Sequence, residues 1–139
     1  MRPRFVLDAW AILAFLQGEE PAASRVRQLL RSAEEKRVDL FVSVVNLGEV
    51  VYRVGRARDE QEAWALLDEI RRLPLVIAPA TDDRVFAAAR LKMRYAISYA
   101  DAFAAALAQE LGATLVTGDP ELESLRGEIP LEKLERVPR

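Results

Sequence analysis

The sequence predicts a three-layer α/β/α fold with a mostly parallel central sheet. Short β-branched or aromatic runs alternate along the chain with segments of helical periodicity. The runs are continuously apolar, which is typical of strands that helices cover on both faces of a parallel sheet. A chain of 139 residues also falls within the usual size of one domain. We therefore expect a single α/β domain over residues 1–139.

The expected elements follow one another in a βαβ rhythm. Strands are expected at Arg4–Leu7, Leu40–Val44, Leu75–Ala78 and Thr114–Thr117. Helices are expected at Ala9–Leu16, Pro21–Lys36, Leu47–Ala57, Glu60–Leu73, Asp82–Met93, Tyr99–Leu111 and Pro120–Leu125. No internal repeat or Gly/Ser linker interrupts this pattern. The proline-containing residues from about 128 onward are expected to form a loosely packed tail.

Composition narrows the class of protein. Hydrophobic residues make up 51% of the chain and charged residues 30%, as in folded globular proteins. The longest apolar run is far shorter than the about 20 residues that span a bilayer, and no signal-peptide pattern opens the chain. We therefore expect a cytoplasmic protein with no membrane association. The net charge of −2 argues against nucleic-acid binding by basic charge alone.

The chain contains neither cysteine nor histidine. This absence excludes disulfides, cysteine nucleophiles, Ser-His-Asp triads, histidine-based nucleases and nearly every zinc enzyme. Catalysis would have to come from carboxylates, lysines, tyrosines, hydroxyls or a cation bound through oxygen. Magnesium and manganese are the cations that suit oxygen ligands best.

Two aspartates lie just beyond expected strands. Asp8 is the only charge in the apolar stretch 5–16, and Asp119 precedes Pro120 after the strand at 114–117. Either residue could simply be a helix N-cap, a role that is typically worth about 1 kcal/mol.

Two further acids lie in the first turns of expected helices. Glu49 is three residues after Asn46, and Asp101 is three residues after Ser98. Both pairs have the spacing of a capping box, so capping is the simpler interpretation of each acid taken alone.

Capping does not explain why all of these acids should gather at the same edge of the sheet. In open α/β sheets, the edge beyond the carboxyl ends of the strands is where ligands bind. Two carboxylates about 4 Å apart repel by roughly 4 kcal/mol at an effective dielectric of 20, several times the value of a cap. A divalent cation would offset that repulsion. The candidate metal-binding and catalytic residues are Asp8, Glu49, Asp101 and Asp119.

The same segments together resemble the PIN domain, and the short chain looks like the VapC-type ribonuclease toxins of toxin–antitoxin pairs. The resemblance covers nearly the whole chain. The first half contributes Asp8 after the first strand and Glu49 six residues after Ser43. The second half contributes Ile-Ser-Tyr-Ala-Asp-Ala at 97–102, an alanine-rich helix, and Leu-Val-Thr-Gly-Asp at 115–119.

The sequence departs from the family pattern at two positions. Trp10 stands where many members carry a small hydroxyl or amide residue, and Leu122 stands where an aromatic residue is frequent. The first departure could alter a hydrogen bond to the metal site or its waters, which puts full activity in question.

The resemblance implies an endoribonuclease that uses Mg²⁺ or Mn²⁺. Asp8, Asp101 and Asp119 would hold one or two metal ions, and Glu49 would bind metal through water or orient the attacking water. Because no histidine can activate a ribose hydroxyl, water must be the nucleophile. An RNA substrate, a protein antitoxin and a homodimer are the implied partners.

Other side chains could assist these partners. Arg53, Arg56 or Arg94 could guide RNA, although arginines near a helix C-terminus often only stay solvated. An apolar group near the start could form a groove for an antitoxin or could pack in the core: Trp10, Leu13 and Phe15.

Two other functions stay open at this point. A magnesium-dependent phosphatase or phosphoreceiver would also place an aspartate after the first strand, but the second aspartate usual in such phosphatases is missing from Asp8-Ala9-Trp10. A noncatalytic PIN-like binding module would use the acids only as helix caps. Metal binding would distinguish the nuclease from that module.

Overall fold

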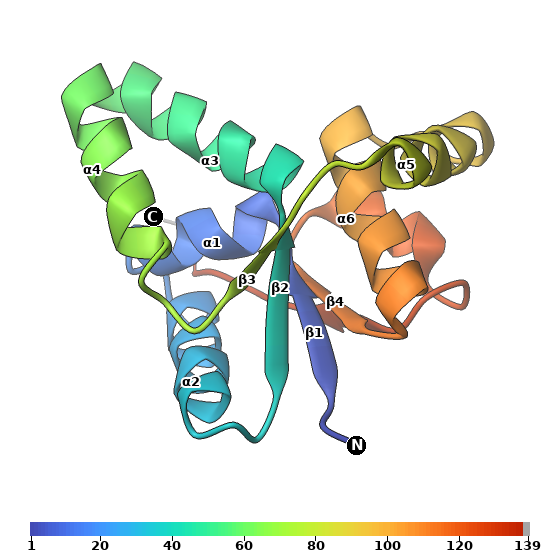
Figure 1. Cartoon of the computed structure of the whole chain (residues 1–139), viewed down its shortest axis with the longest axis horizontal. Helices are drawn as coiled ribbons and strands as arrows, with labels where there is room; N and C mark the ends of the chain where they lie inside the picture. The colour runs from blue at the N-terminus through green and yellow to red at the C-terminus, as the bar shows by residue number, and fades with distance from the viewer. Residues whose placement is uncertain (138–139) are drawn as a thin grey trace.

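The structure, a computed structural model that describes residues 1–137, is built on one five-stranded parallel sheet (Figure 1). The strand order is β3-β2-β1-β4-β5, and each neighbouring pair is parallel. The strands are β1 (Arg4–Leu7), β2 (Asp39–Ser43), β3 (Val76–Ala78), β4 (Thr114–Thr117) and β5 (Leu131–Lys133). The predicted three-layer fold is therefore confirmed.

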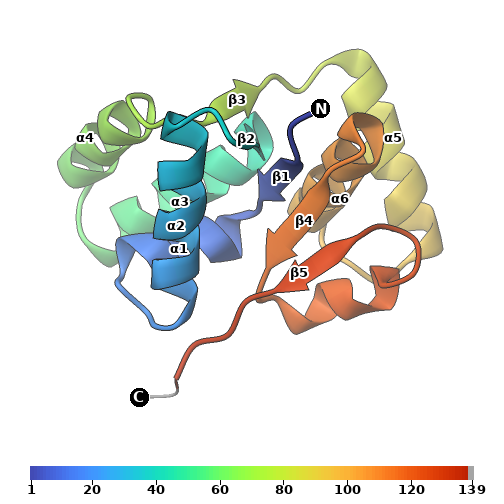
Figure 2. The same cartoon turned by 90° about the horizontal axis from the view of Figure 1, so that it is seen from below.

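Helices cover the sheet on both faces, as Figures 1 and 2 show. One apolar cluster joins one face to α1, α2, α3 and α4, and a second joins the other face to α5, α6 and the 3₁₀ helix η1. These elements are α1 (Ala9–Leu16), α2 (Ala22–Glu34), α3 (Val44–Ala57), α4 (Glu60–Ile70), α5 (Asp82–Arg94), α6 (Tyr99–Leu111) and η1 (Pro120–Leu125).

Successive residues of the central strands enter opposite layers. Val6 and Leu115 belong to the cluster under α5 and α6, whereas Leu7 and Val116 belong to the cluster under α1 and α2. Side chains alternate between the faces of a strand, so a strand buried on both faces must be apolar throughout. This is the physical basis of the continuous apolar runs in the sequence.

The predicted loose tail is wrong over residues 129–137. Ile129 and Leu134 are buried, and β5 pairs with β4 at the edge of the sheet. The Leu134 N–H donates to the Thr117 carbonyl at 2.7 Å. Apolar burial and strand pairing therefore fix this segment; residues 138–139 lie outside the described part of the chain.

The capping prediction for α3 is also wrong. The helix begins at Val44, and Ser43 is its N-cap, with its hydroxyl accepting a hydrogen bond from the Val45 N–H at 3.2 Å. Asn46 is therefore inside the first turn, where its side chain is completely buried. The capping predictions at Asp8, Ser98 and Asp119 are confirmed, because each side chain accepts a backbone hydrogen bond at the start of its helix.

None of the helices within residues 1–137 has the length and apolar character needed to cross a membrane.

Candidate metal centre

Asp8 links the end of β1 to the start of α1. One carboxylate oxygen accepts a hydrogen bond from the Ala11 N–H at 2.9 Å, and the other accepts one from the Thr117 hydroxyl at the end of β4. The side chain is only 1% exposed. Burial raises the pKa of Asp8 to about 7, and the nearby charges of Asp119 and Glu49 add to the rise.

Asp119 follows β4 in the loop that leads to η1. Its carboxylate accepts a hydrogen bond from the Glu121 N–H at 2.9 Å, and its own N–H donates to the Thr117 hydroxyl at 3.0 Å. Thr117 thus joins the Asp119 loop to the carboxylate of Asp8. The hydroxyl of one residue on β4 couples the placement of both acids.

Asp101 is placed by the N-terminus of α6. Its N–H donates to the Ser98 hydroxyl at 3.1 Å, which fixes the first turn of the helix. The side chain is 8% exposed, and burial together with the charge of Asp119 raises the pKa of Asp101 well above its usual range. Both buried aspartates are therefore poorly stabilised as free anions.

Glu49 reaches the same site from α3. Its carboxylate is paired with the guanidinium of Arg53, one turn later on the helix, at 2.9 Å. It is largely shielded from solvent, with 19% of its side chain exposed. Arg53, which the sequence suggested as a guide for RNA, therefore lies beside an acid of the site.

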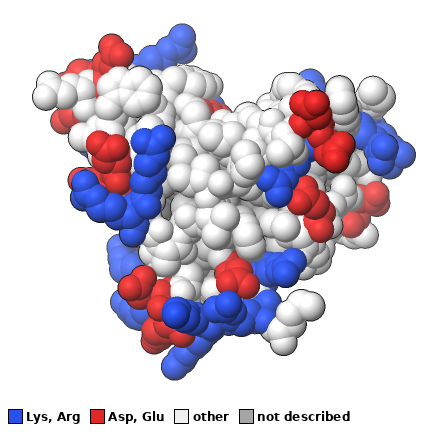
Figure 3. Space-filling model, viewed as in Figure 1, with Lys and Arg blue, Asp and Glu red and all other residues white. Residues whose placement is uncertain are grey.

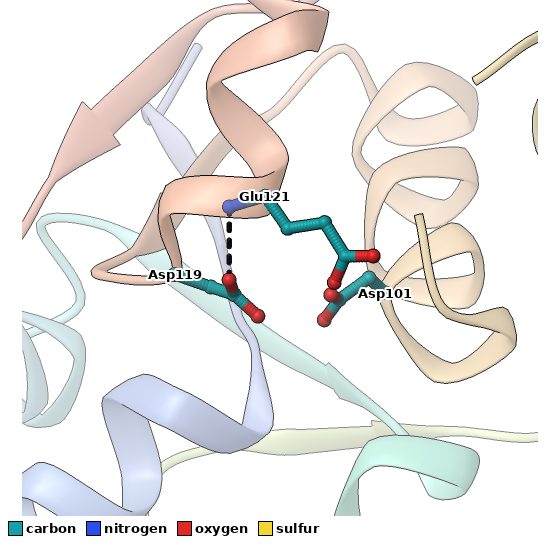
Figure 4. A group of neighbouring side chains, drawn as sticks. All are labelled: Asp101, Asp119 and Glu121. Carbon is teal, nitrogen blue, oxygen red and sulfur yellow. Dashed lines mark hydrogen bonds between the residues drawn. The ribbon is translucent and has the colours of Figure 1, made fainter. Parts of the chain in front are cut away.

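Glu121 completes the acidic group, although it is not among the four acids that the sequence predicts for the site. Oxygen atoms of Asp101, Asp119 and Glu121 lie within 4.8 Å of one another. Figure 4 shows the three carboxylates turned toward one another from α6 and from the start of η1. The available signal is the spacing Asp119-Pro120-Glu121, but this spacing is also typical of an ordinary helix start.

Asp8 and Glu49 are not members of this tightest group, but both lie within its electrostatic reach. The charge of Asp119 acts on Asp8 and Asp101, and the charge of Glu49 acts on Asp8. The structure therefore brings the four predicted acids to one edge of the sheet and adds Glu121 to them.

The donor set fits a hard divalent cation. It consists of carboxylate oxygens, with no nitrogen or sulfur ligand, as Mg²⁺ and Mn²⁺ prefer. The raised pKa values of Asp8 and Asp101 show that the site disfavours uncompensated negative charge. A bound cation would favour the ionised carboxylates and reverse this penalty.

The acids open onto a cleft of about 930 Å³, which is lined by Glu49, Asp101 and Asp119 together with residues of α1, α3 and α4. An adjoining hollow of about 560 Å³ includes Glu121. Figure 3 shows that the molecule is hollowed at this edge, between the lobe of α3 and α4 and the lobe of α5 and α6. Acidic and basic side chains are mixed on this face, so its surface charge has no single sign.

The other residues singled out in the sequence divide between cleft and core. Trp10 and Leu13 line the cleft while packing against the core, whereas Phe15 packs against the core without lining the cleft. Arg53 and Arg56 also line the cleft. Arg94, in the last turn of α5, is not part of this lining.

Asn46 connects two of the elements that carry acids. Its side-chain amide donates to the Ala100 carbonyl at 3.0 Å, which ties the first turn of α3 to the first turn of α6. Its side-chain oxygen is buried and has no hydrogen-bond partner among residues 1–137. Because Glu49 and Asp101 lie on these two helices, this bond helps to set the spacing between them.

A PIN domain family model matches residues 5–128. The chain belongs to the PIN domain family. This family contains nucleases that use divalent metals, and the acidic cluster of this chain is consistent with that chemistry. No curated protein sequence matches the chain.

Solved structures of VapBC proteins share the fold. The chain is similar to VapBC2 from Rickettsia felis, solved bound to a promoter DNA fragment, with a TM-score of 0.73, 19% identity, and coverage of 95% of this chain and 99% of that chain. It is also similar to DNA-bound VapBC from Salmonella typhimurium, with a TM-score of 0.71, 18% identity, and coverage of 94% and 98%. VapC20 from Mycobacterium tuberculosis, a Sarcin-Ricin loop cleaving toxin, matches with a TM-score of 0.69, 16% identity, and coverage of 86% and 93%.

Proposed function

We propose that this PIN domain is a Mg²⁺- or Mn²⁺-dependent endoribonuclease and the toxin of a toxin–antitoxin pair. The observation that carries the proposal is the convergence of carboxylates at the carboxyl edge of the sheet. The group of Asp101, Asp119 and Glu121, with Asp8 and Glu49 in electrostatic range, has the composition of a metal site. The match to the PIN family supports nuclease chemistry for that site.

The acids divide into two roles in this proposal. Asp8, Asp101 and Asp119 hold one or two metal ions, and Glu121 is an additional candidate ligand beside Asp119. Glu49 binds metal through water or orients the attacking water. When bound, the metal supplies a nucleophilic water at neutral pH and neutralises charge on the phosphate.

The rest of the site has supporting roles. Thr117 donates a hydrogen bond to Asp8 and so restrains the rotation of its carboxylate. Arg53 compensates the charge of Glu49 and lines the cleft, where its guanidinium is placed to bind an RNA phosphate. The chain has no histidine to deprotonate a ribose 2′-hydroxyl, so hydrolysis by water is the consistent route.

We also propose a protein antitoxin and a homodimer as partners. The antitoxin is supported by the VapBC structures that share this fold. A ribonuclease free in its own cell would be harmful, which gives an inhibitory partner a clear purpose. The homodimer follows from the family resemblance alone, and light scattering of the purified protein would test it.

The proposed function is tested by incubating the purified protein with RNA in Mg²⁺ or Mn²⁺ and, separately, in chelator. We expect cleavage only with metal, and products that end in 5′-phosphate and 3′-hydroxyl. The Asp119→Asn variant should bind less metal and cleave little RNA, whereas Asp59→Asn, an N-cap change at an exposed position on α4, should cleave normally.

A 2′,3′-cyclic phosphate formed in chelator would contradict the proposal, because it would show attack by the ribose hydroxyl without a metal. Absence of both metal binding and RNA cleavage would instead favour the noncatalytic PIN-like module, in which the acids only cap helices. The phosphatase or phosphoreceiver alternative is set aside, because the chain belongs to the PIN family.

A further inference from the structure

The segment that follows β5 runs along the turn between α1 and α2 (Figure 2). The Ala22 N–H donates to the Glu135 carbonyl at 2.9 Å, and the Val137 N–H donates to the Glu20 carbonyl at 2.8 Å. The side chain of Leu134 is buried. Backbone hydrogen bonds and one apolar side chain thus hold the segment against this turn.

The side chain of Arg136 is held over an aromatic ring of the cleft. Its guanidinium carbon lies 5.1 Å from the centroid of the Trp10 ring, and one guanidinium nitrogen donates to the Glu19 carboxylate at 3.1 Å. Half of the Arg136 side chain stays exposed. Both Arg136 and Trp10 line the cleft that also contains Glu49, Asp101 and Asp119.

Trp10 is itself fixed against the loop that carries an acid. A Cβ atom at Gly118 would lie 2.2 Å from the indole ring, so the ring sits directly on the backbone between Thr117 and Asp119. Only glycine leaves room for it there. The Arg136 guanidinium is therefore connected through Trp10 to the Asp119 loop.

This arrangement has the chemistry of a nucleotide subsite. A guanidinium held over an indole ring keeps N–H donors for a phosphate, and its own plane is a surface on which an unpaired base can stack. An exposed arginine without such support loses side-chain entropy on binding. Arg136 lies beyond residues 5–128, the part of the chain that the family model matches, whereas Trp10 lies within it.

We propose that Arg136, seated on Trp10, forms a nucleotide subsite that binds an unpaired nucleotide of the RNA next to the cleaved phosphate. This inference rests on the proposed ribonuclease function, because it names residues that position the same substrate. Trp10, a departure from the family pattern, acquires a positive role as the platform for Arg136.

The test compares Arg136→Ala with a matched control, Arg126→Ala. Arg126 is also a half-exposed arginine in an ion pair, with Glu123, but it does not line the cleft. We expect Arg136→Ala to raise KM for a single-stranded RNA oligonucleotide about 10-fold, with a smaller change in kcat. In a plot of the logarithm of the RNA-binding constant against the logarithm of the salt concentration, the magnitude of the slope should fall by about one. Arg126→Ala should match the wild type in both measurements.

A fluorescence measurement separates substrate contact from a purely structural role. The chain has two tryptophans, and Trp64 is exposed on α4, so a Trp64→Phe background leaves Trp10 as the only reporter. With Asp119→Asn added to prevent cleavage, oligouridine should change the emission of Trp10. The further change Arg136→Ala should raise the RNA concentration that gives half of this fluorescence change about 10-fold. The metal-induced rise in melting temperature, measured with Asp119 intact, should be the same with and without the Arg136→Ala change and so confirm folding.

Equal KM, equal salt slope and equal fluorescence response for Arg136→Ala and the wild type would overturn the subsite while leaving the ribonuclease in place. Failure of the wild type to cleave RNA in metal would overturn the proposed function, and the subsite would fall with it.

Discussion

Replacement of Asp8 by asparagine is expected to stabilise the metal-free protein at alkaline pH. The Asp8 carboxyl is buried, and its pKa is raised from 3.8 to about 7 in the folded protein. Between these two pH values the unfolded chain releases the proton while the folded chain keeps it. The free energy of unfolding therefore falls as pH rises through this window and levels off above about pH 7.

The size of the effect follows from the pKa. A rise from 3.8 to about 7 corresponds to a penalty of about 4 kcal/mol at pH 8, which is an upper limit for the gain in Asp8→Asn. Asparagine is as good an N-cap as aspartate, so the bond from the Ala11 N–H at the start of α1 can be kept. We expect a net gain of about 1 kcal/mol or more at pH 8, and almost none at pH 4.

The assay is urea denaturation at pH 4 to 8 in chelator, repeated in Mn²⁺. Asp59→Asn, which changes the N-cap of α4 at an exposed position, is the matched control. In Mn²⁺ the wild type should be more stable than Asp8→Asn at pH 8, because the bound ion stabilises the wild type and binds the variant much more weakly. An Asp8→Asn protein less stable than the wild type at pH 8 in chelator would refute the argument, since it would show that the hydrogen bonds of the carboxylate outweigh its burial.

Three further predictions concern the surroundings of the acids. Gly118→Ala should destabilise the protein by about 1 to 3 kcal/mol in thermal unfolding, because the new Cβ overlaps the Trp10 ring. In a chain that also carries Trp10→Ala, most of this loss should disappear, and an equal loss of stability with and without Trp10 would contradict the contact. Asn46→Ala should weaken Mn²⁺ binding about 10-fold in calorimetry, because the tie from α3 to the Ala100 carbonyl is lost, and unchanged affinity would show that this bond does not set the site. Expression of the wild type should arrest bacterial growth, whereas expression of Asp101→Ala, with its folding checked by circular dichroism, should not. Growth arrest by both proteins would show that toxicity does not depend on the acidic site.

The central strands could be predicted from sequence because their environment leaves a local pattern. Burial on both faces makes the buried positions of β1 and β4 largely apolar, and the bounds of both strands were predicted correctly. The short edge strand β5 was missed, since Glu132 and Lys133 point to an exposed segment and the pairing partner, β4, is distant in sequence. Its stability comes from tertiary contacts that no local pattern encodes.

Part of the candidate site could also be predicted from sequence, because the topology of a parallel sheet fixes where residues after its strands lie. Acids that follow strands or begin helices reach one edge of a parallel sheet by topology, so the convergence of Asp8 and Asp119 could be anticipated. Glu121 was missed because its spacing also fits a helix start. The contact of Arg136 with Trp10 joins residues near the two ends of the chain, and the sequence around either residue does not predict it.

The most direct test of the account is the binding of Mn²⁺ itself, followed by the electron paramagnetic resonance signal of the free ion. Titration of the wild type at pH 8 should show one or two saturable sites, and Asp101→Asn, Asp119→Asn and Glu121→Gln should each weaken binding, whereas Asp59→Asn should not. Wild-type protein that leaves all Mn²⁺ free, or carboxylate variants that bind it as tightly as the wild type, would contradict the claim that these acids form a metal centre.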